Sequence, residues 1–224
     1  MQSGLSAGGR KGAHGPFRVI LIFSLLVLAI ATASRIGLGL WQGERVAAVD
    51  GWSHLLLQGI RVDIATLCWL WGVAALGTAI FSGDHLIGRA WQWILRLWLT
   101  IGLWTILFLE VSTPAFIEEY GIRPNRLYVE YLIYPKEVLS MLWAGRKLEL
   151  IFSVVLSIAT LWGGWVLSGK LCKNLRFPRW YWRPVLAVLV IVLTLLGARS
   201  TLGHRPINPA MVAFADDPLV NSLV

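Results

Sequence analysis

Five long apolar stretches constrain the fold of this chain more than any other feature of its sequence. A helix needs about 20 residues to cross the hydrocarbon core of a bilayer, which is ~30 Å thick. Four of the stretches have 18 residues or more, and the shorter fifth follows three aromatic residues at 180–182 that suit the headgroup zone. With 57% hydrophobic and 14% charged residues, the chain is predicted to be an all-α integral membrane protein and not a soluble globule. The five predicted transmembrane helices are Phe17–Ser34, Ile64–Phe81, Ala90–Leu109, Leu150–Leu167 and Pro184–Ala198.

The Lys and Arg residues predict the orientation of these helices. If the N-terminus is cytoplasmic, the tail and the two loops on its side carry nine Lys and Arg and one acid, Asp84. The opposite side carries ten Lys and Arg but also eleven Asp and Glu, mostly in one long loop where the positive-inside rule has little weight. Five crossings then place the C-terminus outside the cytoplasm. The net charge of +8 faces anionic inner-leaflet lipids in this arrangement and does not indicate a nucleic-acid partner.

The first span also has features of a cleavable signal peptide. It combines a basic N-terminal region with an apolar run and the small residues at 31–33. The apolar run continues to Trp41, which is long for a signal peptide, so a retained helix is favoured. The two cysteines, Cys68 in the second span and Cys172 after the fourth, are expected at different depths and as free thiols.

The segment between the third and fourth spans, residues 110–149, is predicted to be a folded extracytoplasmic loop of about 40 residues. Thr113 followed by Pro114 predicts a helix start, and Gly121 predicts its end. Apolar residues then recur every three or four positions up to the fourth span, with an interruption at Pro135. The expected structure is a short helical hairpin on the outer surface.

Two further polar positions lie at the borders of the spans. Arg61 and Asp63 stand two residues apart before the second span, so they cannot face each other on one helix. Arg96 lies about 10 Å inside the third span. Its side chain either reaches the inner headgroups or makes a polar contact inside the bundle, and both interpretations stay open. Arg96 belongs to a polar stripe on one face of this helix, formed by Arg89, Gln92, Arg96 and Thr100.

The sequence contains no familiar catalytic motif. Its four His residues are scattered, and it has no Gly-rich phosphate loop, nucleophile elbow or HExxH motif. The adjacent acids Glu118 and Glu119 point apart on a helix, so they do not predict a catalytic pair. A transporter is disfavoured because the spans have few charges and no pair of broken helices.

Several polar motifs lie on the predicted outer side of the spans. They are Gly59-x-Arg61-x-Asp63, the runs FIEEYGIRPN at 116–125 and YLIYPKEV at 131–138, and the segments GHRPINP at 203–209 and DPLVNS at 217–222. In this order, on five spans, they resemble the N-terminal membrane half of the lipoteichoic acid synthase and phosphoglycerol transferase family. The likeness extends over nearly the whole chain from Phe17 on.

The resemblance implies a transferase in the bacterial plasma membrane that moves glycerol phosphate from phosphatidylglycerol onto a glycan or polymer outside the cell. Its catalytic half, of the sulfatase and alkaline phosphatase superfamily, would supply a Thr nucleophile and a divalent metal such as Mn²⁺. That half would follow Val224 and be the partner of this chain, which is expected to be inactive alone and to hold no cofactor. The expected parts are a cytoplasmic tail (1–16), a transmembrane domain (17–199) and a truncated extracytoplasmic linker (200–224).

The outer polar residues are the candidate site for an anionic lipid headgroup, since Arg binds phosphate oxygens bidentately and Lys supplies a point charge. In the competing interpretation these charges pair with one another and only hold the loop. A different class of function is a stand-alone, non-catalytic envelope protein that binds a lipid or a partner through the loop. The candidate lipid-binding residues are Arg61, Asp63, Glu118, Arg123, Asn125, Arg126 and Lys136.

Overall fold

The computed structural model describes residues 15–83, 85–131, 133–172, 180–200 and 209–224, and within them all regular structure is helical. Five helices are long and apolar enough to cross a membrane, counting the short 3₁₀ turn at Trp180–Trp182 with the last of them. The helices are α1 (Arg18–Trp41), α2 (Gly43–Ala48), α3 (Trp52–Phe81), α4 (Leu86–Tyr120), α5 (Arg126–Tyr131), α6 (Pro135–Gly145), α7 (Lys147–Cys172), α8 (Arg183–Arg199), α9 (Pro209–Val212) and α10 (Pro218–Ser222).

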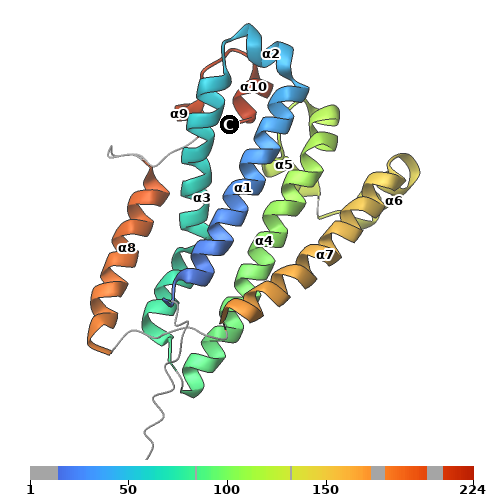
Figure 1. The fold of residues 1–224 in the computed structure, drawn as a ribbon. Coiled ribbons are helices and arrows are strands. Elements are labelled where there is room, and N and C mark those ends of the chain that lie inside the picture. Colours follow the sequence, from blue (N-terminus) through green and yellow to red (C-terminus); the bar gives the residue numbers. More distant parts are fainter. Residues whose placement is uncertain (1–14, 84, 132, 173–179, 201–208) are drawn as a thin grey trace, which may run out of the picture.

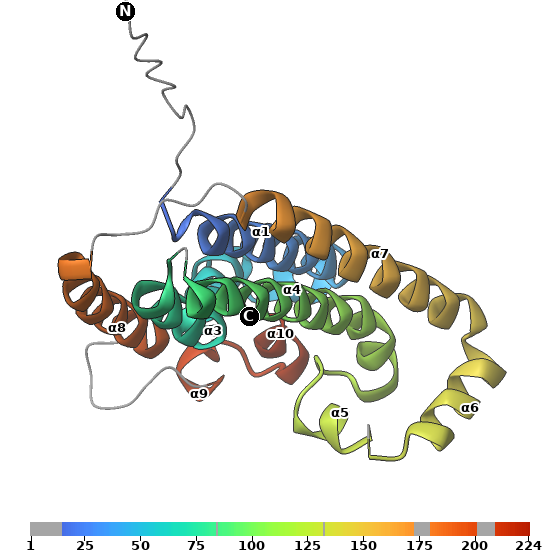
Figure 2. The ribbon, with the colours of Figure 1, turned by 90° about the horizontal axis from the view of Figure 1, so that it is seen from below.

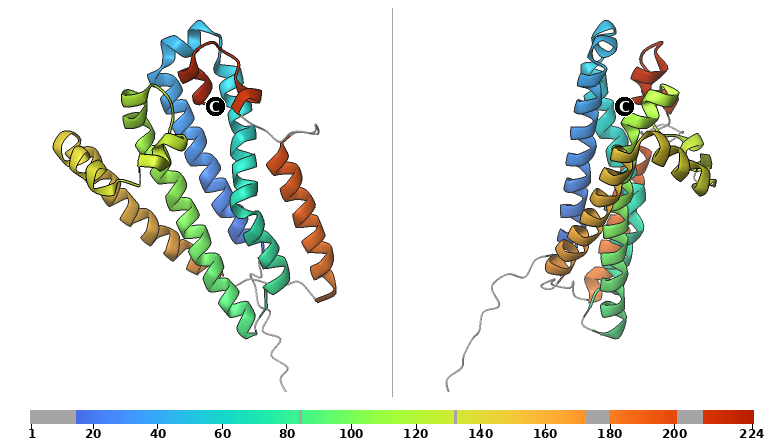
Figure 3. Two further views of the ribbon diagram at one scale, coloured as in Figure 1. Left: turned by 180° about the vertical axis from the view of Figure 1, so that it is seen from behind. Right: turned by 90° about the vertical axis from the view of Figure 1, so that its right-hand side faces the viewer.

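The long helices form a central group of three with one helix on each side (Figure 1). Helices α1, α3 and α4 pack against one another, α8 lies along α3, and α7 lies along α4. The view from below in Figure 2 places α8 and α7 at opposite edges, and Figure 3 shows the bundle from behind and from its narrow side.

The two ends of the bundle differ in their residues. At one end α1, α4 and α8 begin and α3 and α7 finish; it carries Arg18, Arg89, Lys170 and Arg183 and is called the basic end. At the other end, called the loop end, α2, α9 and α10 gather over the tops of α1 and α3 (Figure 1).

Two apolar clusters hold the central helices together. The larger one lies toward the basic end and is centred on fully buried Phe23, Leu95 and Leu99, with Trp71 against them. The second lies at the loop end, where Leu38, Leu55 and Ile117 from the long helices meet the C-terminal segment; its other members are Val46, Val212, Leu219, Leu223 and Val224. The C-terminal segment is therefore part of the packed structure.

Helices α7 and α8 bury little of their surface. Only 6% is buried of the most apolar 18 residues of α7, and the same holds for α8 taken with the 3₁₀ turn before it. Apolar side chains exposed on this scale are not stable in water, whereas they suit a lipid environment. The five candidate spans and this exposed apolar surface indicate a multi-pass membrane protein.

Several helices extend further than the apolar stretches predict. α1 continues to Trp41, and α3 begins at Trp52, so that Gly59, Arg61 and Asp63 lie inside a helix and not before it. α4 continues to Tyr120 and, at 1.5 Å per residue, is about 50 Å long. The first part of the predicted loop 110–149 is therefore the end of this helix.

The predicted helix start at Thr113 is wrong, because Thr113 and Pro114 lie inside α4. Pro114 lacks the N–H that would bond the carbonyl of Glu110 in a regular helix, and the hydroxyls of Ser112 and Thr113 donate one residue earlier, to the carbonyl of Leu109, at 3.0 and 2.8 Å. The predicted end at Gly121 is confirmed: this glycine has φ 70°, and its N–H donates to the carbonyl of Ile117.

The rest of the loop forms two short helices, α5 and α6, separated where Pro135 interrupts the periodicity. Pro135 occupies the first turn of α6, where its missing N–H costs nothing. No residue of α6 is buried.

Candidate functional site

A buried ion pair joins α1 to α3 near the loop end. Arg35 of α1 donates from both terminal nitrogens to the two carboxylate oxygens of Asp63 of α3, each at 2.8 Å. The Arg35 side chain is 2% exposed and that of Asp63 is 11% exposed. A buried charge is tolerated only when it is paired with good geometry, which this bidentate contact supplies.

Gly59, one helical turn before Asp63, makes room for the arginine. A Cβ on Gly59 would overlap the Nε and guanidinium carbon of Arg35, so only glycine allows this approach. The Nε atom itself is buried and has no hydrogen-bond partner among the described residues. The Gly-x-Arg-x-Asp motif thus supplies two separate elements of one contact, the space and the counter-charge.

A second ion pair links α4 to the segment that follows it. Arg123 donates to both carboxylate oxygens of Glu110 at 2.6 Å, and the two side chains are 17% and 14% exposed. The hydroxyl of Ser34, next to Arg35 on α1, also donates to Glu110 at 2.6 Å. The two ion pairs are therefore neighbours across α1.

The C-terminal segment lies against both ion pairs. Arg35 donates to the backbone carbonyl of Val224 at 3.1 Å, and Arg123 donates to that of Leu223 at 3.4 Å. The hydroxyl of Ser222 accepts from the backbone N–H of Arg123 at 3.2 Å. We call this set the loop-end cluster; its members are Ser34, Arg35, Asp63, Glu110, Arg123 and residues 222–224.

Local bonds shape the segment for this contact. The Asp217 side chain caps α10 by accepting from the N–H of Leu219 at 2.8 Å. The amide of Asn221 accepts from the backbone of Phe214 and Ala215 and donates back to Ala215. The motif DPLVNS at 217–222 therefore acts as a folded unit. Of the motif at 203–209, only Pro209 falls within the described residues.

The candidate lipid-binding residues do not share one set of contacts. Five of them meet different side chains: Arg61 contacts Gln58, Asp63 contacts Arg35, Glu118 contacts Arg146, Arg123 contacts Glu110, and Arg126 contacts Glu130. Arg61 and Asp63 have separate partners, as their spacing predicts, and Arg61 also donates to the carbonyl of Ser200 at the end of α8. The backbone carbonyl of Asn125 accepts from the N–H of Tyr128. Lys136 is exposed in the first turn of α6.

Glu118 takes part in an exposed contact where α6 meets α7. Arg146 donates to Glu118 at 2.8 Å and to Glu149 at 3.2 Å. The hydrogen bond to Glu118, followed by that to Glu149, raises the pKa of Arg146 above its ordinary value. This guanidinium therefore stays charged, and it ties the loop to the start of α7.

Sequence reasoning missed Arg35, Ser34 and Glu110. The predicted first span ended at Ser34 and the predicted loop began at Glu110, so both charges were assigned to the membrane border. The signal that could have found Arg35 is the apolar run on its C-terminal side up to Trp41, which places the arginine within a long apolar helix. An ionisable residue in that position needs a partner inside the protein.

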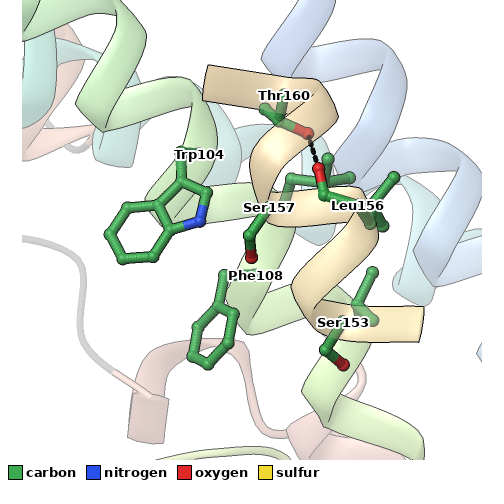
Figure 4. A pocket seen from close by; sticks show the side chains of 8 residues that line it. Trp104, Phe108, Ser153, Leu156, Ser157 and Thr160 are labelled. Atoms are coloured by element: carbon green, nitrogen blue, oxygen red, sulfur yellow. Dashed lines mark hydrogen bonds between the residues drawn. The ribbon is translucent and has the colours of Figure 1, made fainter. Parts of the chain in front are cut away.

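A narrow crevice between α4 and α7 is a second feature (Figure 4). Trp104 and Phe108 of α4 face Ser153, Ser157 and Thr160 of α7 across it. Thr160 donates to its own helix at Leu156, at 2.8 Å, and the crevice has no volume for a water molecule. It is a helix-packing contact of small residues against aromatic rings.

The described residues contain no group of three or more His, Cys, Asp or Glu side chains that could hold a metal ion. Both carboxylates of the loop-end cluster are used in pairing, Asp63 with Arg35, and Glu110 with Arg123 and the hydroxyl of Ser34. What it can do is fix the C-terminal segment to the long helices. No protein-family model and no solved structure matches the chain.

Proposed function

We propose that this chain is the membrane-anchoring and lipid-presenting domain of a phosphoglycerol transferase similar to lipoteichoic acid synthase, acting on phosphatidylglycerol. The observation that supports this proposal is the loop-end cluster. Three motifs of the family resemblance meet there. The motif at 59–63 contributes Gly59 and Asp63, the run at 116–125 contributes Arg123, and the third is the segment 217–222. Their contacts hold residues 222–224 against α1 and α4, so a domain that follows Val224 would start from a fixed position and direction.

The lipid-presenting part of the proposal rests on α5 and α6. The side chain of Arg126 is 92% exposed, and Lys136 is exposed as well. The same segment carries large apolar side chains that are exposed, among them Ile133, Leu139 and Trp143. A short helix with exposed apolar residues and cations suits the interface of a bilayer, where the cations meet phosphate groups.

We further propose that the basic end faces the cytoplasm of a bacterial cell and the loop end faces the outside. A reporter that is active only outside the cytoplasm is expected to be active when fused after Val224 and inactive when fused after Lys173. A cytoplasmic reporter gives the reverse pattern. Activity of the cytoplasmic reporter after Val224 would contradict both the five-span orientation and the transferase proposal, since phosphatidylglycerol is used on the outer face.

The reading frame past Val224 and the activity of its product test the function. We expect a continuation that encodes a sulfatase-like domain, and we expect the longer protein to release diacylglycerol from phosphatidylglycerol with Mn²⁺. The purified 224-residue chain is expected to release none above a lipid-only blank. A stop codon directly after Val224 would instead favour a stand-alone envelope protein that binds a lipid or a partner through its loop.

A further inference from the structure

A groove opens between α4 and α7 near the basic end, at the opposite end of the bundle from the loop-end cluster. Its free volume is about 380 Å³. Gln92, Trp93 and Arg96 line it from α4, and Trp165, Gly169 and Lys170 line it from α7. It thus combines two cations and an amide with two indole rings.

The guanidinium group of Arg96 is held in place within this groove. Its central carbon lies 4.1 Å from the ring centroid of Trp165 and 5.2 Å from that of Trp93. One terminal nitrogen donates to the backbone carbonyl of Trp165 at 3.3 Å. Gly169 permits this position, because a Cβ there would lie 2.7 Å from the same nitrogen. The sequence leaves two interpretations open for Arg96. In the structure its side chain makes a polar contact inside the bundle, with the carbonyl of Trp165.

Arg96 has hydrogen-bonding capacity that the described residues do not use. A guanidinium group carries five N–H donors, and among the described residues Arg96 has one acceptor, the carbonyl of Trp165. No Asp or Glu of the described residues forms an ion pair with Arg96 or Lys170. At the loop end the situation differs, since Arg35, Arg123, Arg126 and Arg146 each have a carboxylate partner.

The ligand that this arrangement suits is an anion with several acceptor oxygens and an apolar body. Arg binds a phosphate group through two parallel N–H bonds, and Lys170, two residues before the end of α7, adds a second charge. The helix surfaces beside the groove are apolar and exposed, with Trp93 60%, Ile94 49% and Trp162 72% exposed. Acyl chains would be accommodated along them, whereas a free phosphate ion would leave them uncovered.

We propose that this groove binds the phosphate headgroup of an anionic phospholipid from the leaflet at the basic end. The site is independent of the proposed lipid presentation, which takes place at the loop end.

The test places a photo-crosslinking benzoylphenylalanine at Val166, which lines the groove, or at Ile158, which is 63% exposed on α7 away from it. The full chain is reconstituted in phosphatidylcholine vesicles that contain phosphatidylglycerol, and the lipid adducts are identified by mass. We expect phosphatidylglycerol to be enriched over its share of the membrane at Val166 and not at Ile158. Equal adduct composition at the two positions would overturn the proposal.

Charge variants make the result specific. Arg96→Gln is expected to lower the phosphatidylglycerol adduct at Val166 about tenfold or more, as the loss of a charge-assisted hydrogen bond predicts. Lys170→Gln, at an exposed side chain that does not hold the fold, is expected to lower it in the same direction, and Lys147→Gln at the other end of α7 is the matched control. An unchanged adduct in Lys170→Gln and Arg96→Gln would reject the site. Suppression of the adduct by soluble glycerol phosphate would assign the groove to a free phosphate ester and overturn the lipid assignment.

Discussion

Replacing Asp63 by Asn is expected to lower the free energy of unfolding by about 3–5 kcal/mol, the usual cost of removing one partner of a buried ion pair. The variant keeps the shape of the side chain but leaves the positive charge of Arg35 uncompensated at 2% exposure. For a chain of this length the melting temperature should fall by about 6 °C or more. The purified protein in detergent, melted in parallel with the unsubstituted chain, gives the measurement.

A double variant separates the charge from the packing. Arg35→Met combined with Asp63→Leu is expected to recover most of the lost stability, because an apolar pair of similar volume avoids the cost of burying ions. Glu119→Gln, at an exposed position of α4, serves as the control and should change stability by less than about 0.5 kcal/mol. If Asp63→Asn melts like the unsubstituted chain, the ion pair does not form in the folded protein.

The second large effect is expected at Arg123. Arg123→Ala removes the partner of Glu110 and the contact to the carbonyl of Leu223, and should cost about 2–3 kcal/mol, somewhat less than a fully buried pair. Because its N–H groups already bind Glu110 and Leu223, the same substitution should leave the retention of phosphatidylglycerol nearly unchanged. Melting curves and native mass spectrometry of the same sample measure the two quantities.

Arg126→Ala is the matched comparison, since the side chain of Arg126 is 92% exposed and its ion pair with Glu130 is an i,i+4 contact on the surface. Its stability should change by less than about 0.5 kcal/mol, while the lipid-presenting proposal predicts weaker retention of phosphatidylglycerol. Loss of lipid in Arg123→Ala without a change in melting temperature would show that Arg123 binds lipid and is not part of a structural ion pair.

The sequence by itself determined the number of long helices and where several of them end. Apolar length predicts five candidate spans because a helix that shields its own backbone is the form a chain takes in hydrocarbon. Gly121 ends α4 because only glycine adopts φ 70° without a steric cost, and Pro135 divides α5 from α6 because it cannot continue a helix. These features depend on neighbours within one or two turns, so they can be read from the chain.

The predicted helix start at Thr113 was wrong because it, too, depended only on neighbours in the sequence. A threonine followed by proline favours a helix start, but α4 passes through Pro114 and ends only at Tyr120. The helix also continues beyond its apolar part since Phe116 and Ile117 are buried against other elements. Packing on those residues outweighs the local signal.

The contents of the loop-end cluster were decided only by the tertiary structure. Asp63 has a polar neighbour in sequence, Arg61, yet pairs with Arg35, 28 positions away, and Glu110 pairs with Arg123 while also accepting from Ser34, 76 positions away. Which charges meet depends on the rotation and tilt of α1, α3 and α4, and these are set by the buried apolar side chains and by the space that Gly59 leaves. The order of residues gives the charges that must be neutralised, and the packing of the helices selects the partners.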